Sequence, residues 1–143
     1  MSRKRSPVND LKNVLETIGK AEMFVEGIEY EDFLEDEKTI FAVSKAIELV
    51  GETLKHVPEE IKAQYPDVPW EDIYGMRNFL AHNYFSSDVD EIWKTVKDDI
   101  PELKPILQDI LQKESEKLQE ENKNEPPRVE ESEESLAGHI IAP

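Results

Sequence analysis

Apolar residues recur at steps of three and four positions along most of the chain, the spacing that places side chains on one face of an α-helix. No stretch has the regular alternation of apolar and polar residues that is typical of a β-strand. The sequence therefore predicts an all-α fold, an up-and-down bundle of about four to five main helices with short connections. The pattern is clearest in two early segments, formed by Leu11, Val14, Leu15, Ile18, Ala21, Val25 and Ile28 and then by Ile40, Val43, Ile47, Val50 and Leu54.

Residues that typically begin or end a helix stand at the boundaries of these two segments. Ser6 followed by Pro7 is typical of a helix start, and Asp36 can cap the second helix. Gly27 is expected to end the first helix. Gly19 lies inside that helix, either as a weak point or as a place where another helix comes close. Between the two helices we expect a short apolar linker, residues 30–34, packed as a plug.

The second half of the chain continues the helical pattern. Residues 58–65 are expected to form a short helix, residues 70–84 a longer one and residues 89–96 another. Residues 99–101 end in proline and predict a new helix start, because proline cannot continue the backbone hydrogen bonds of a preceding helix. The last helix is expected to bury one apolar face, made of Leu103, Ile106, Leu107, Ile110, Leu111 and Leu118.

The chain is strongly acidic, with a formal net charge of −16. This charge argues against tight, nonspecific binding to nucleic acid and suits a partner with a basic surface. Beyond Gln119 the sequence is rich in Glu, Asn, Pro and Ser. We therefore expect a helical domain over residues 1–121 and a disordered acidic tail over residues 122–143.

The composition also excludes several kinds of site. The chain has no cysteine, so disulfides and thiolate metal sites are absent. Its three histidines, His56, His82 and His139, lack the spacing of metal ligands, and we expect no metal and no cofactor. No apolar run is long enough to span a bilayer, and the basic N-terminus lacks the apolar stretch of a secretory signal. A cytoplasmic protein with no membrane contact is the expectation.

One short stretch gathers the side chains best suited to chemistry. Arg77 carries a permanent positive charge on a planar fork that can hold a phosphate by two hydrogen bonds. His82 can give and take protons near neutral pH. Asn78 can orient either group because its amide both donates and accepts, and Tyr84 adds a hydroxyl.

Helix geometry limits what one copy of this stretch can do. At roughly 100° per residue, Arg77 and Tyr84 fall within about 20° of each other and share a face, whereas Arg77 and His82 lie about 140° apart. Three arrangements could still bring them to one site: a bend in the helix, a sweep of the long Arg77 side chain, or a second copy of the chain. The third arrangement predicts a symmetric homodimer with the two motifs facing each other.

Trp70 and Tyr74 precede the motif at helical spacing. They could stack on an RNA base, as aromatic side chains do in proteins that bind single strands. Packing in the core is the commoner role for such residues, and we favour it.

The spacing Arg77-X4-His82-X-Tyr84, within the string WEDIYGMRNFLAHNYF, resembles the motif of the HEPN superfamily and of its HepT-like branch in particular. The strings AVSKAIELVGETLKHVPEEIKAQYPDVPW upstream and IWKTVKDDIPELK downstream are similar to the same branch. The resemblance covers about Asp10 to Leu111.

This resemblance implies a HEPN-like helical bundle and a toxin that cleaves RNA without a metal ion. It implies catalytic roles for Arg77, Asn78 and His82 at a dimer interface. It also implies an MntA-like minimal nucleotidyltransferase antitoxin, in a hetero-complex with the dimer. That antitoxin would silence the toxin by AMPylation of Tyr84.

The chemistry of RNA cleavage suits these residue types, because RNA carries its own nucleophile in the 2′-hydroxyl. His82 would act as general base or acid, Arg77 would stabilise charge on the phosphate, and Asn78 would position either group. Two proton transfers are needed, so a second His82 from a dimer or one His82 acting twice would complete the reaction. The alternative is a noncatalytic module that binds a nucleotide or a nucleotidyltransferase through the same residues.

Overall fold

The computed structural model describes residues 6–74 and 89–124. Over these residues every regular element is helical, which confirms the predicted all-α fold. The elements, in order along the chain, are α1 (Pro7–Val25), α2 (Tyr30–Leu34), α3 (Glu37–Lys55), α4 (Glu59–Gln64), a helical turn at 70–74, α6 (Val89–Lys94), the π-helical η1 (Thr95–Asp99) and α7 (Ile100–Asn124).

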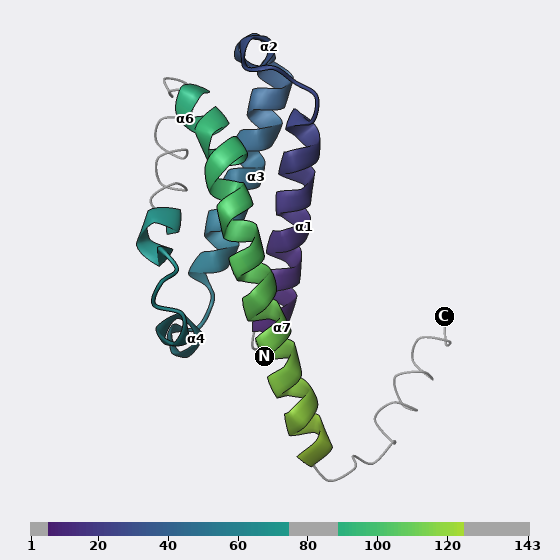
Figure 1. Ribbon diagram of the computed structural model, residues 1–143, viewed down its shortest axis with the longest axis vertical. Helices are drawn as coiled ribbons and strands as arrows, with labels where there is room; N and C mark the ends of the chain where they lie inside the picture. Colours follow the sequence, from purple (N-terminus) through teal and green to yellow (C-terminus); the bar gives the residue numbers. More distant parts are fainter. Residues whose placement is uncertain (1–5, 75–88, 125–143) are drawn as a thin grey trace, which may run out of the picture.

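Three long helices form the body of the bundle. The α1 helix packs against both α3 and α7, and the three lie lengthwise beside one another (Figure 1). The short α2 covers one end of this group, and α4 lies toward the other. The last turns of α7 extend beyond the rest of the bundle. Within the described ranges, no helix has the length and apolar character needed to cross a membrane.

The predicted start and end of α1 and the predicted start of α3 are confirmed. The Ser6 hydroxyl oxygen accepts from the backbone N–H of Asn9 at 3.3 Å, with Pro7 in the first turn of α1. Gly27 follows α1 with a φ of 75°, a left-handed conformation that glycine adopts without strain. One carboxylate oxygen of Asp36 accepts from the backbone N–H of Thr39 at 3.0 Å and caps α3.

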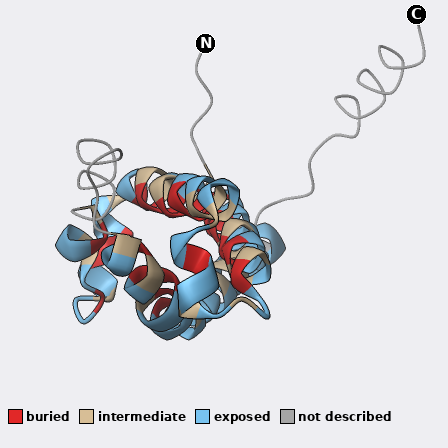
Figure 2. Cartoon of the chain, turned by 90° about the horizontal axis from the view of Figure 1, so that it is seen from above, coloured by how far each residue is buried: buried red, intermediate tan, exposed pale blue. Residues whose placement is uncertain are grey.

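The core divides into two clusters of buried apolar side chains. In Figure 2 the ribbon of the buried residues, coloured red, lies mainly toward the inside of the bundle. The main cluster joins α1, the second half of α3, α4, the turn at 70–74 and α7. The second cluster joins the C-terminal end of α1, α2, the first half of α3, α6 and η1. Each Å² of apolar surface that is removed from water stabilises the fold by about 25 cal/mol, and this is the main force that holds these helices together.

The predicted restart at residues 99–101 coincides with the start of α7 at Ile100, but the chain is not interrupted there as expected. The helix runs without interruption from Val89 to Asn124, through the π-helical residues of η1. The backbone N–H of Ile100 donates to the carbonyl of Thr95, five residues earlier. A π-helical turn already leaves one carbonyl without its usual partner, so Pro101, which has no N–H, can follow without a further loss.

Two other segments differ in detail from the expectation. Residues 30–34 form a helix rather than a linker, and only Phe33 acts as a plug, because it is fully buried while Leu34 is exposed. On α7, Leu103, Leu107 and Ile110 are buried as expected, but Ile106 and Leu118 are exposed. The predicted tail lies, from residue 125 onward, outside the described residues.

Candidate active site

The four motif residues Arg77, Asn78, His82 and Tyr84 all lie in the stretch 75–88, which falls outside the described residues. The structure therefore describes how the two ends of this stretch are held. The turn at 70–74 leads into it, and α6 leads out of it. Each end is attached to a different cluster of the core.

The leading turn is attached to the main cluster. Ile73 is buried, with 3% of its surface exposed, and belongs to that cluster. The Trp70 indole N–H donates to the carbonyl of Tyr65 at 3.2 Å, and the Tyr74 hydroxyl makes a long hydrogen bond of 3.5 Å to the carbonyl of Leu54. Both aromatic rings pack against the core. The core role that we favoured for Trp70 and Tyr74 is therefore confirmed.

A buried lysine supports the same turn. The Lys62 side chain is only 9% exposed, and its ammonium lies 4.7 Å from the centre of the Tyr74 ring. That ammonium also donates to the carbonyl of Lys55 at 3.3 Å and lies 3.4 Å from a carboxylate oxygen of Glu59. A cation over an aromatic ring is attracted to its negative face. Lys62 thus joins α4, the end of α3 and the turn before the motif. Sequence reasoning missed it, since nothing in the pattern marks one lysine among many.

The trailing end is attached to the second cluster. Ile92 of α6 is buried there with 1% of its surface exposed. The Trp93 ring packs on Phe33, with ring centres 4.9 Å apart, and on Tyr30 at 5.9 Å. The Tyr30 hydroxyl donates to a carboxylate oxygen of Asp90. Aromatic pairs at such distances add to the stability that burial alone provides.

Other chemical groups in the described part of the chain do not form a competing centre. Among residues 6–74 and 89–124, no group of three His, Asp or Glu side chains could hold a metal ion. His56 caps the end of α3, with its ring nitrogen Nε2 3.8 Å from a carboxylate oxygen of Glu52. His56 thus lies at the C-terminus of a helix, as predicted, where a positive charge is favourable.

Comparison with known proteins identifies the family. The profile described as "Ribonuclease HepT-like" matches residues 14–110. The chain belongs to the HepT-like family. The matched residues include the whole Arg77-X4-His82-X-Tyr84 motif and both elements that hold its ends.

Individual relatives agree with this assignment. The chain is 46% identical over 101 residues to "Probable ribonuclease HepT" of Thermococcus cleftensis, a match that covers 71% of this chain and 92% of that protein. It is 34% identical over 109 residues to "Putative RNase MJ1216" of Methanocaldococcus jannaschii, covering 73% and 90% respectively. A third relative is "Putative RNase TTE0752" of Caldanaerobacter subterraneus, 41% identical over 90 residues, covering 63% and 80%. No solved structure gives a significant match.

Proposed function

We propose that this HepT-like chain is an endoribonuclease that cleaves RNA without a metal ion, and that Arg77, Asn78 and His82 form its catalytic site. The observation that carries the proposal is the intact motif inside the matched residues 14–110. The names of the relatives, which call them ribonucleases, point to the same class of reaction.

The reaction uses the 2′-hydroxyl of RNA as the nucleophile. One His82 imidazole removes the hydroxyl proton, the oxygen attacks the neighbouring phosphorus, and the 5′-oxygen leaves with a proton supplied by an imidazolium. Arg77 stabilises the negative charge that develops on the phosphate, and Asn78 positions the phosphate or His82. The upstream RNA fragment then ends in a 2′,3′-cyclic phosphate, and the downstream fragment begins with a free 5′-hydroxyl.

A homodimer would supply the second imidazole, because the two proton transfers fall on opposite sides of the phosphorus. The symmetric arrangement also brings two Arg77 side chains to one site. A local cationic site of this kind is needed, because the chain as a whole carries a net charge of −16 and repels the RNA backbone.

We propose, as the family resemblance implies, that the chain is a toxin of a toxin–antitoxin pair. Its partner would be an MntA-like nucleotidyltransferase that attaches AMP to Tyr84, in a complex with the dimer. On the helix predicted for this stretch, Arg77 and Tyr84 would share a face, so an anionic group on Tyr84 would occupy and neutralise the phosphate site. This gives a physical reason for the modification to silence cleavage.

The test is cleavage of an RNA substrate by the purified protein in the presence of EDTA, beside the His82→Ala variant. We expect the substitution to slow cleavage by roughly 10²–10⁴-fold, the usual contribution of a general acid or base. Circular dichroism would check that the variant keeps its helices. The intact mass of the same sample would show whether Tyr84 already carries AMP.

Two outcomes would contradict the proposal. Cleavage that EDTA abolishes would show a metal-dependent reaction. Unmodified protein that binds a nucleotidyltransferase but cleaves no RNA would show the noncatalytic binding module instead.

A further inference from the structure

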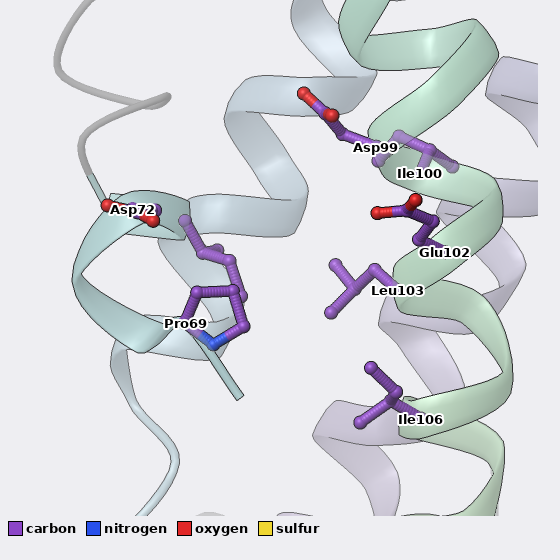
Figure 3. Close-up of a pocket in the computed structure, with 8 residues that line it drawn as sticks. Pro69, Asp72, Asp99, Ile100, Glu102, Leu103 and Ile106 are labelled. Atoms are coloured by element: carbon purple, nitrogen blue, oxygen red, sulfur yellow. The ribbon is translucent and has the colours of Figure 1, made fainter. Parts of the chain in front are cut away.

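A groove opens on the surface directly before the motif stretch. It lies between the turn at 70–74 and the first two turns of α7, and has a volume of about 240 Å³ (Figure 3). From α7, Leu103 and Ile106 point across it toward Pro69. Small-molecule sites usually measure roughly 300–1,000 Å³. The groove is therefore sized for one or two side chains of a protein rather than for a nucleotide.

The floor of the groove is apolar and fixed in place. Ile73, Ile100 and Leu103 line it and belong to the main cluster, with no more than 6% of any of them exposed. Ile106 stands at its mouth with 37% of its surface exposed. A preformed apolar pocket beside an exposed isoleucine favours the burial of an aliphatic side chain from another molecule.

The rim of the groove is acidic. Asp72, Asp99 and Glu102 line it, and within the described residues no ion pair neutralises them. The nearest lysines of this helix are engaged elsewhere. Lys97 lies 5.1 Å from the centre of the Trp93 ring, and Lys104 pairs with Glu22 of α1 at 2.8 Å.

The apolar floor and the acidic rim together determine which kind of molecule can bind in the groove. RNA is disfavoured because its phosphates would meet three carboxylates. The homodimer proposed above forms through the motif, so a second copy at this groove would be a separate contact. It is disfavoured because a chain with a net charge of −16 would have to bring a basic patch to these three carboxylates. A partner protein that presents an aliphatic side chain flanked by lysine or arginine satisfies both the floor and the rim.

We propose that this groove is a docking site for a basic segment of a partner protein, with one aliphatic side chain inserted between Pro69 and Ile106. The groove adjoins the turn that leads into the motif, so the partner would be held next to the active site without entering it. This proposal stands whether or not the chain cleaves RNA.

Fluorescence anisotropy with the full chain tests it. The probe is a short labelled peptide with one leucine flanked by lysines, and the control peptide has alanine in place of that leucine. We expect the leucine peptide to bind roughly tenfold more tightly, because its side chain is removed from water in the groove. We expect Glu102→Lys to weaken both peptides severalfold, and added salt to do the same.

Two further variants make the test specific. Ile106→Ser, at an exposed position, should remove most of the difference between the two peptides while leaving the fold intact. Glu120→Lys makes the same charge change at an exposed position near the end of α7, and it should weaken the two peptides much less than Glu102→Lys does.

Three results would overturn the proposal. Equal binding of the leucine and alanine peptides would show attraction to the acidic surface alone. A smaller molar mass for Ile106→Ser than for the wild type, by sedimentation, would show that a second copy covers the groove. Loss of RNA binding in Ile106→Ser would assign the groove to RNA.

Discussion

Replacing Ile73 with alanine separates the stability of the bundle from the placement of the motif. Ile73 is 3% exposed and attaches the turn before residues 75–88 to the main cluster. The substitution removes three carbon atoms from the core. At about 0.8 kcal/mol for each methylene group, plus the cost of the cavity left behind, it should lower the free energy of unfolding by about 3 kcal/mol.

The matched control is Ile110→Ala. Ile110 is fully buried in the same cluster, but it belongs to α7 and does not line the groove. The loss of stability should be similar, since the same atoms leave the same core. Urea unfolding followed by circular dichroism would measure both values, with an unchanged slope confirming two-state behaviour.

The two variants should differ in activity. Under conditions where both are fully folded, single-turnover cleavage of RNA should be slower for Ile73→Ala, because the turn before the motif has lost part of its attachment to the core. Ile110→Ala should cleave at the wild-type rate. Equal rates for the two variants, or a loss of less than about 1 kcal/mol for Ile73→Ala, would refute the argument that this side chain positions the motif.

Three smaller predictions concern stability. The Ser44 hydroxyl is buried and has no hydrogen-bond partner among residues 6–74 and 89–124, so Ser44→Ala should stabilise the fold by about 1 kcal/mol in thermal unfolding. Thr95→Val removes a hydroxyl that is bonded to its acceptor at 2.8 Å, and it should not stabilise the fold. Apart from its chain neighbours and the backbone of its own helix, no atom of the described residues lies within 4 Å of a Cβ built on Gly19. Gly19→Ala should therefore raise the stability by about 1 kcal/mol, and a loss would indicate that another chain covers this face. Two hydrogen bonds from Thr39 lower the pKa of the Asp36 carboxyl, the one from its side chain more than the one from its backbone. The charged carboxylate of Asp36 therefore stabilises the fold more than the protonated form does. Asp36→Asn should therefore lower the melting temperature most near neutral pH and progressively less as the pH falls below 3.8, the ordinary value; a constant difference would contradict this.

Gly19 illustrates how the structure decides between two readings of one residue. The sequence allowed either a weak point or a close helix approach. The open space around this position supports the weak point within the described residues. The cost of glycine in a helix is a local property, but the approach of a neighbour is a property of the packed molecule.

Features that depend on neighbours along the chain could be predicted from the amino-acid sequence. The apolar spacing gave the helices, and the side chains of Ser6 and Asp36 gave their starts, because a cap bonds to a backbone N–H only three residues away. The conformational freedom of glycine at residue 27 ended α1. The motif and the surrounding residues were also sufficient to predict the family.

Features that depend on residues far apart in the chain became visible only in the packed molecule. Proline at 101 reads locally as a helix start, yet the packing of Ile92, Val96 and Ile100 in the core keeps one helix continuous through a π-helical turn. The apolar spacing on α7 does not distinguish Leu107, which is buried, from Ile106, which stands at the mouth of a groove. Burial is set by which helices pack around a residue, and that arrangement is a sum of contacts between distant segments rather than a property of any one of them.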